Sequence, residues 1–334
     1  MAFDRSGSPY ALGLSSGELV EVRSRREILA TLDRDGKLDA LPFMPEMLKY
    51  CGQRFTVYKR AHKTCDTIDF FKGRRMVDTV HLVGLRCDGE AHGGCQAGCF
   101  LFWKEAWLKR VATAQISLPL PSHLHPEADG EDMSSTTEAD LLRATRSVTD
   151  SSDPSNDVFQ CQATELLKAS QPLSWRDPRQ YVRDLTSRNV SFATMLRAMA
   201  GAAYRAIRRR VTGMRHPIQG PLTTTTPRSR LDLKPGELVR VKSKEAIVAT
   251  LNQQNRNRGM WFDIEQLPYC GKTFRVLRRV ERIVNEKTGK MMRFQNDCII
   301  LEGVTCGGHL SRDRLFCPRS IYPYWREIWL ERVE

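Results

Sequence analysis

The feature that most constrains the fold of this chain is an internal repeat. Residues 17–87 align with residues 236–306 at a constant offset of 219, without a gap. Over these 71 positions we count 24 identical residues, where average composition gives about four or five by chance. After a three-residue insertion, the alignment continues to Val111 and Val333. The sequence therefore predicts two copies of one domain, called repeat 1 and repeat 2 here.

Each repeat has the pattern of a small, mostly β domain. The stretches "LVEV", "YCGQRFTVYKR" and "DTVHLVGLRC" alternate as short strands do, and Ser24 with Glu27 forms a capping box that opens a brief helix. Four tryptophans at matching positions are expected in the cores: Trp103, Trp107, Trp325 and Trp329. We expect an α+β, mostly β chain in which each repeat of ~95 residues forms a barrel-like, SH3-like domain.

The composition changes twice between the repeats. An acidic stretch rich in Ser, Thr and Pro indicates a flexible linker. "VSFATMLRAMAGAAYRAIRRR" then predicts an amphipathic helix, expected to dock its apolar face against one or both repeats or, alternatively, to lie on a membrane surface. The predicted division has six parts: an N-terminal extension (residues 1–16), repeat 1 (residues 17–111), the linker (residues 112–157), a helical connector (residues 158–215), a polar tether (residues 216–235) and repeat 2 (residues 236–334).

The cysteines of repeat 1 predict a metal site. "RCDGEAHGGCQAGC" holds three cysteines and a histidine in fourteen residues, with glycines that bend the chain. The four predicted ligands are Cys65, Cys87, Cys95 and Cys99. Four thiolates suit zinc or an iron–sulfur cluster, and the spacing leaves the two undecided, because it lacks the paired C-x2-C of most zinc sites. His62 and His92 are expected beside the ligands, and Cys161 is a fifth contact or a core residue.

Repeat 2 keeps only part of this set. Cys87 and Cys95 recur as Cys306 and Cys317, whereas Cys65 aligns with Val284 and Cys99 with Ile321. A second metal site is predicted at Cys306, His309 and Cys317, with Cys298 as a candidate to complete it; the alternative is a decayed site held by apolar packing.

Composition places the chain among cytoplasmic proteins. No run of about 18 uncharged apolar residues is present, so no transmembrane segment is predicted. Ten cysteines in a reducing compartment favour metal ligation over disulfides as the reason for a tight cluster. The formal charge of +13 favours anionic partners, and Arg197 to Arg230 contain eight arginines and no acid.

The predicted function is that of a metal-dependent biosynthetic or redox enzyme, with its centre in repeat 1 and a cleft between the repeats that takes a small-molecule or anionic substrate. No phosphate loop, nucleophile elbow or H-E-x-x-H motif identifies a reaction. One alternative is a nucleic-acid or polyanion binder with a structural zinc. Another is an assembly scaffold that binds a protein partner through the helix at 190–210.

Overall fold

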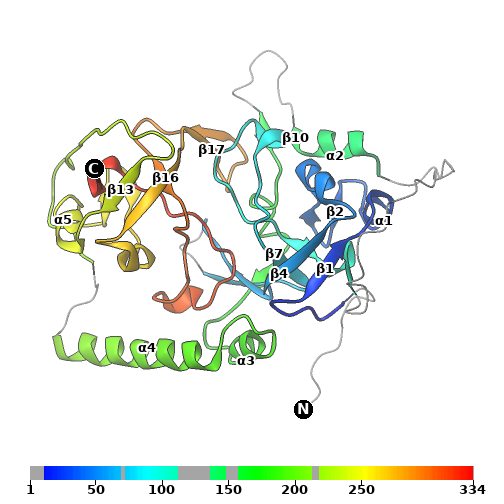
Figure 1. Cartoon of the computed structure of the whole chain (residues 1–334), viewed down its shortest axis with the longest axis horizontal. Coiled ribbons are helices and arrows are strands. Elements are labelled where there is room, and N and C mark those ends of the chain that lie inside the picture. Colours follow the sequence, from blue (N-terminus) through cyan, green and yellow to red (C-terminus); the bar gives the residue numbers. More distant parts are fainter. Residues whose placement is uncertain (1–10, 69–71, 112–135, 148–156, 213–217, 334) are drawn as a thin grey trace.

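The two repeats lie side by side, repeat 2 on the left and repeat 1 on the right of the computed structural model in Figure 1. The structure describes residues 11–68, 72–111, 136–147, 157–212 and 218–333. The fold is mixed and sheet-rich, with a few helices and several small antiparallel sheets, none of which closes on itself. This confirms the predicted mostly β class.

The main sheet of repeat 1 has the order β8-β7-β4-β1-β9. Its strands are β1 (Leu19–Val22), β4 (Arg54–Arg60), β7 (Thr79–Leu82), β8 (Trp103–Lys104) and β9 (Leu108–Arg110). The other elements are α1 (Arg25–Leu29), β2 (Lys37–Leu38), β3 (Leu41–Pro42), β5 (Lys63–Cys65), β6 (Gly73–Arg75) and the 3₁₀ turns η1 (Pro45–Tyr50), η2 (Glu90–His92) and η3 (Glu105–Trp107). The predicted capping box at Ser24 and Glu27 is present and starts α1.

The main sheet of repeat 2 has the order β19-β16-β13-β20. Its strands are β13 (Leu238–Val241), β16 (Thr273–Arg279), β19 (Ile299–Leu301) and β20 (Leu330–Arg332). The other elements are α5 (Lys244–Val248), β14 (Arg256–Asn257), β15 (Met260–Trp261), β17 (Arg282–Val284), β18 (Met291–Arg293) and the 3₁₀ turns η6 (Ile264–Tyr269), η7 (Arg312–Arg314) and η8 (Glu327–Trp329). Trp325 pairs with Ile299 as an isolated bridge, at the edge where repeat 1 places β8.

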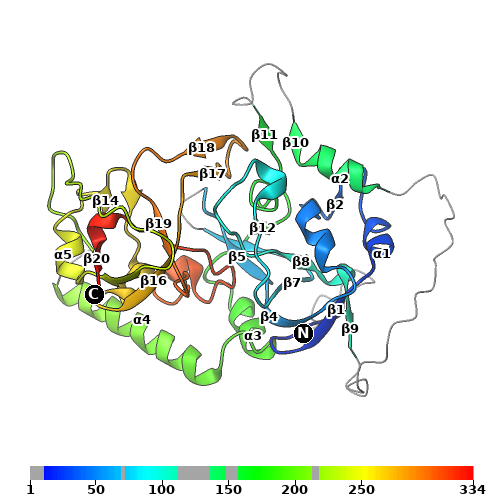
Figure 2. The same ribbon diagram turned by 45° about the horizontal axis from the view of Figure 1, so that its top comes forward.

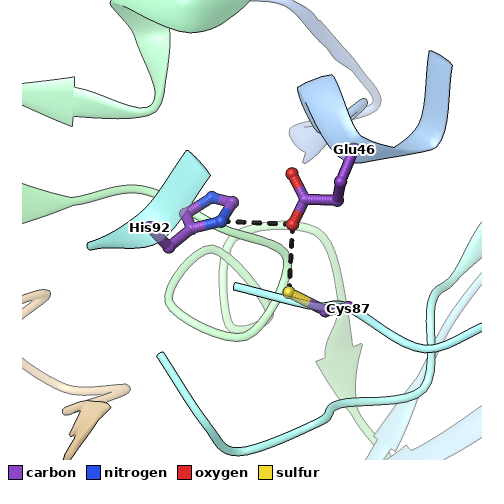
Figure 3. A group of neighbouring side chains, drawn as sticks. All are labelled: Glu46, Cys87 and His92. Atoms are coloured by element: carbon purple, nitrogen blue, oxygen red, sulfur yellow. Dashed lines mark hydrogen bonds and ion pairs between the residues drawn. The ribbon is translucent and has the colours of Figure 1, made fainter. Parts of the chain in front are cut away.

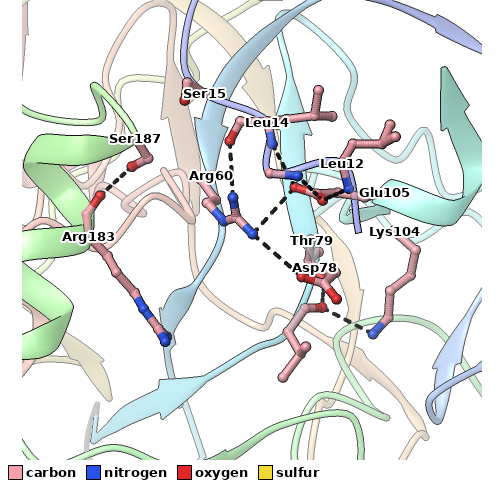
Figure 4. A network of polar contacts seen from close by, with 12 residues as sticks. Leu12, Leu14, Ser15, Arg60, Asp78, Thr79, Lys104, Glu105, Arg183 and Ser187 are labelled. Carbon is pink, nitrogen blue, oxygen red and sulfur yellow. Dashed lines mark hydrogen bonds and ion pairs between the residues drawn. The ribbon is translucent and has the colours of Figure 1, made fainter. Parts of the chain in front are cut away.

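Buried tryptophans and one buried carboxylate organise each core. The four predicted core tryptophans are all fully buried. In repeat 1, both oxygens of Glu105 accept hydrogen bonds from the backbone N–H groups of residues 12–14, at 2.5 to 3.0 Å, and Arg60 lies 3.5 Å away (Figure 4). Glu327 accepts from residues 231–233 in the same way, with Arg279 beside it. Residues just before each repeat are thereby fixed to its core.

The connector between the repeats is built of short pieces and one long helix. Its elements are α2 (Glu138–Ala144), β10 (Arg146–Ser147), β11 (Val158–Phe159), β12 (Gln171–Pro172), α3 (Arg179–Thr186) and α4 (Phe192–Thr212). Most of the predicted acidic linker, residues 112–135 and 148–156, lies outside the described residues. The described part contains α2, whose Leu141 is buried in the core of repeat 1, so this part is a docked helix rather than a free linker.

Each repeat extends a hairpin onto the other. The hairpin β5–β6 of repeat 1 reaches repeat 2, where Arg319 donates a 3.0 Å hydrogen bond to the carbonyl oxygen of Cys65. The hairpin β17–β18 of repeat 2 reaches repeat 1, where the N–H of Gln96 donates to the carbonyl oxygen of Arg282 at 3.0 Å. This exchange, at the centre of Figure 2, encloses a space between the two sheets.

Candidate metal centre

A glycine-rich loop, residues 87–99, carries three of the predicted ligands. The N–H of Cys87 donates to the carbonyl oxygen of Cys99 at 2.8 Å, which places these two cysteines side by side at the neck of the loop. Gly89 has a φ of 80°, and a Cβ there would lie 2.0 Å from the carbonyl oxygen of Cys95. Only glycine lets the loop fold back so closely that Cys95 returns toward the neck.

A cavity of about 830 Å³ lies between the repeats, and four cysteines form part of its wall: Cys87, Cys95, Cys99 and Cys161. All four are half-buried. Cys161 is contributed by the connector, just after β11, and packs partly against the core of repeat 1. The sequence suggested Cys161 as a fifth contact or a core residue, and the structure places it in this wall together with three of the four predicted ligands.

The four thiols interact electrostatically. Burial raises the pKa of Cys87, and neighbouring Glu46, Cys99 and Cys161 raise it further. Burial also raises the pKa of Cys161 to about 11, with Cys95 adding to the effect. The pKa of Cys99 is raised by burial and then by neighbours that include Cys161 and Cys95. Without a cation Cys87, Cys99 and Cys161 stay thiols, because burial disfavours the thiolate and neighbouring negative charge adds to that effect.

Donors from repeat 2 face these sulfurs. The N–H of Val284, on β17, donates to Cys95 Sγ at 3.3 Å. The guanidinium of Arg319 is buried and binds both carboxylate oxygens of Glu286 at 3.0 and 3.1 Å. Burial and the charge of Glu286 raise the pKa of Cys99, and Arg319 lowers it by a smaller amount. A backbone N–H and a buried cation both favour negative charge on sulfur. The cavity wall therefore supplies thiols together with groups that stabilise thiolates.

Cys65 lies elsewhere. It is fully buried in the hairpin β5–β6, does not line the cavity, and hydrogen-bonds through its thiol to Cys317 of repeat 2. This hydrogen bond is the main reason that the pKa of Cys317 is lowered to about 6, while that of Cys65 is raised. The structure thus does not bring all four predicted cysteines into one set, because the hairpin that carries Cys65 crosses to the other repeat.

A second cluster adjoins Cys87 (Figure 3). The Cys87 thiol donates to Glu46 Oε1 at 3.0 Å, and His92 Nδ1 lies 3.2 Å from the same oxygen. His92 Nε2 lies 3.1 Å from the carbonyl oxygen of Gln160 and therefore carries a proton. Glu46 Oε2 and His92 Nδ1 have no hydrogen-bond partner. Because Nδ1 and the carboxylate are both acceptors, a proton or a metal ion must lie between them.

The predicted second site in repeat 2 is not assembled in the same way. Cys306 lies beside a cation of the protein, since a guanidinium nitrogen of Arg314 is 3.9 Å from its Sγ. His309 packs its ring against Phe316, and Cys317 bonds to Cys65. Cys306 and Cys317 nevertheless act on each other electrostatically, and both act on Cys65, so two of the three predicted ligands are near one another and near a cysteine of repeat 1.

The closeness of potential ligand atoms differs between the two groups. Thiolates bind one zinc ion at about 2.3 Å, so four of them around zinc stand close together. Within the described residues, the only potential ligands from three or more side chains that lie within 4.8 Å of one another belong to Glu46, Cys87 and His92. No three of the four cavity cysteines therefore have their sulfurs within 4.8 Å of one another.

Comparison of the chain with family models, curated proteins and solved structures found no match. Within the described residues, no helix is long and apolar enough to cross a membrane.

Proposed function

We propose that the protein is an iron–sulfur enzyme, with a cluster ligated by four cysteines beside a substrate cavity: Cys87, Cys95, Cys99 and Cys161. The observation that supports this most is that all four border one cavity of about 830 Å³ between the repeats. A cluster there supplies electron transfer, or an iron that binds substrate, next to a space the size of a small-molecule site. Cys161 takes the place that the sequence alone suggested for Cys65.

The other groups at the site have roles that follow from their contacts. Glu46, which accepts a hydrogen bond from the Cys87 thiol, is positioned to receive that proton when the thiol becomes a ligand and to pass it to His92 Nδ1, which leaves an imidazolium beside a carboxylate. Arg319 offsets part of the negative charge of bound thiolates. Val284 holds Cys95 through its N–H. None of these roles requires the side chains to move far.

The far wall of the cavity favours an anionic substrate with an apolar part. Repeat 2 contributes three exposed basic residues to this wall, Arg258, Lys287 and Arg293. Large apolar and aromatic side chains lie among them: Trp261, Met292, Phe294 and Tyr324. Basic side chains at the rim of an apolar space suit a carboxylate or phosphate attached to an organic body.

A second candidate is a mononuclear zinc enzyme with ligands Glu46, Cys87 and His92. It is favoured by the closeness of the three ligand atoms and by Glu46 Oε2, a buried atom without a hydrogen-bond partner. Three protein ligands with one open position are typical of catalytic zinc. Because Cys87 belongs to both ligand sets, the two candidates exclude each other in one molecule.

One experiment separates the candidates. The protein purified without oxygen should be brown and contain about four iron and four sulfide per chain. Cys161→Ser should lose the iron and sulfide. Cys65→Ser is the matched control, because Cys65 is hydrogen-bonded to Cys317 and does not line the cavity, and it should keep both. A colourless protein with about one zinc per chain that is lost in His92→Ala and kept in Cys161→Ser would select the zinc enzyme instead.

We further propose that the two repeats descend from one SH3-like domain. Glu105 and Glu327 accept three backbone N–H groups each from equivalent positions, which supports a common ancestor. In repeat 1, the strands β1, β4, β7 and β8 neighbour one another in chain order, and β9 returns to pair with β1 after a 3₁₀ turn. That order is the one expected of a small SH3-like barrel.

A further inference from the structure

The helix α4 presents an apolar surface that no described part of the chain covers. It begins at Ser191, whose hydroxyl accepts the N–H of Thr194, and its first turns are anchored by Met195, which is buried against Phe316 and Val190. Beyond this anchor the helix runs along the lower edge of the molecule in both views (Figures 1 and 2). The predicted docking of its apolar face against the repeats is therefore wrong beyond Met195.

The uncovered residues are large and lie close together on the helix. Phe192, Leu196, Met199 and Ile207 follow the spacing of one helical face. The most exposed apolar side chains of α4 are Phe192 (71%), Leu196 (58%), Met199 (59%), Tyr204 (65%), Ile207 (62%) and Val211 (80%). Such a stripe on one helix is larger than the scattered apolar side chains of an ordinary surface and indicates a binding surface.

The charge of the same helix restricts its partner. Residues 192–212 contain five arginines and no aspartate or glutamate. Arg197 and Arg210 are exposed beside or within the apolar stripe. Pairing α4 with the α4 of a second copy would bring these like charges together without an acidic partner on either helix, which costs free energy. Nucleic acid would satisfy the arginines but leave the apolar stripe in water.

An anionic lipid surface satisfies both parts. The apolar face of such a helix enters the boundary between head groups and acyl chains, and arginines extend along it to the lipid phosphates. We propose that α4 is a membrane-surface anchor that holds the protein on anionic lipid bilayers. The proposal is independent of the metal centre, because α4 contributes no residue to the cavity wall.

The test is co-sedimentation of the full chain with vesicles. Binding is expected to vesicles of mixed phosphatidylglycerol and phosphatidylcholine, and to be at least about tenfold weaker to phosphatidylcholine alone or in high salt. Leu196→Glu and Ile207→Glu should each weaken binding to the anionic vesicles at least about tenfold. The matched control, Val83→Glu, adds the same charge at an apolar residue of repeat 1 that is 51% exposed, and should bind as the native chain does.

Two further measurements keep the outcomes separate. Thermal unfolding of the α4 variants should equal that of the native chain, because both side chains are exposed. Failure of the native chain to sediment with anionic vesicles, or equal binding by Leu196→Glu, overturns the proposal. A native dimer that becomes monomeric in Ile207→Glu, seen by sedimentation velocity, would also overturn it and assign the stripe to a contact between copies.

Discussion

Cys87 of repeat 1 and Cys306 of repeat 2 occupy equivalent positions, yet their surroundings differ. Cys87 lies on the cavity beside the acceptor Glu46, with further thiols nearby. The Sγ of Cys306 lies 3.9 Å from Arg314, and Arg314 also binds Asp263, at the position where repeat 1 has Met44. Repeat 2 thus places the guanidinium of Arg314 beside the cysteine whose counterpart in repeat 1 is a proposed metal ligand.

The equivalent carboxylates, Glu46 and Glu265, also have different hydrogen-bond partners in the two repeats. Glu46 faces a thiol and an imidazole, and one of its oxygens has no partner. Glu265 accepts three backbone N–H groups from residues 309–311 at 2.7 to 3.0 Å and so holds a loop. The same residue on the same fold serves structure in one half and stays available to a ligand in the other. We infer that a site can be lost to packing without loss of the fold.

The largest expected difference between the repeats concerns metal. Cys87→Ser should abolish iron and sulfide binding, because one cluster ligand is removed, whereas the equivalent change Cys306→Ser should leave both unchanged. Metal analysis of the two variants purified without oxygen measures this, with circular dichroism to show that both are folded. Equal loss of iron in Cys306→Ser would mean that the two repeats share the centre.

The next largest effect concerns the buried carboxylates, where we expect the repeats to behave alike. Glu105→Ala and Glu327→Ala each leave three buried N–H groups without an acceptor and should lower the free energy of unfolding by about 3 kcal/mol or more. Denaturant unfolding measures this. A large loss in only one variant would show that the equivalence of the two cores is superficial.

The pH dependence of the Glu327 effect has a definite sign. Burial raises the pKa of Glu327, but hydrogen bonds from Leu233, Leu231 and Asp232 and the charge of Arg279 lower it overall. A depressed carboxyl pKa stabilises the fold above the pKa of the unfolded chain, and the stabilisation is lost as the pH falls through the folded value. The difference between the native chain and Glu327→Ala should therefore shrink in acid.

Much of the fold was predictable because it is local. The capping box at Ser24 and the burial of the tryptophans depend on residue type and near neighbours, and the structure has both where expected. The positions of Cys65 and Cys161 relative to the other cysteines could not be predicted, for one physical reason. Each is placed by contacts between segments, the hairpin exchange for Cys65 and the connector for Cys161, and periodicity within one repeat carries no information on either.

The apolar face of α4 was predictable as a pattern but not in its exposure. Residues such as Leu196 and Ile207 have the spacing of a core-facing helix, and this spacing is the same whether protein or lipid covers the face. The Glu46–Cys87–His92 cluster was also missed, although Glu46 is one of the residues identical in the two repeats. Identity of an acidic residue in both copies was the available signal.

A smaller effect is expected at His81, which replaces the Ile300 of repeat 2. His81 is fully buried, and burial lowers its pKa to about 3. The folded state favours the neutral ring, so the contribution of His81 to the free energy of unfolding is complete above the unfolded pKa near 6.5. Below that pH the contribution is lost, and the free energy of unfolding should fall by about 2 kcal/mol between pH 7 and pH 5. His81→Ile should remove this acid sensitivity. Unchanged sensitivity would assign it to another group.

The smallest effect is expected from an attempt to restore the site in repeat 2. Ile321→Cys supplies the counterpart of Cys99 and gives repeat 2 three cysteines at the positions of the loop in repeat 1. We expect no added metal, for three reasons. Cys317 is hydrogen-bonded to Cys65, and the guanidinium of Arg314 lies beside Cys306. The fourth thiol of the proposed centre in repeat 1, Cys161, comes from the connector.

Metal analysis of Ile321→Cys, alone and combined with Arg314→Met, checks this expectation, with the iron content of the native chain as the reference. Removing the cation of Arg314 leaves Cys306 accessible to a metal but still without a fourth cysteine, so the double variant should also bind no more iron than the native chain. An additional equivalent of metal in the double variant alone would show that Arg314 is what keeps repeat 2 empty. An additional equivalent in both would show that the missing cysteine was the only difference that mattered between the two halves.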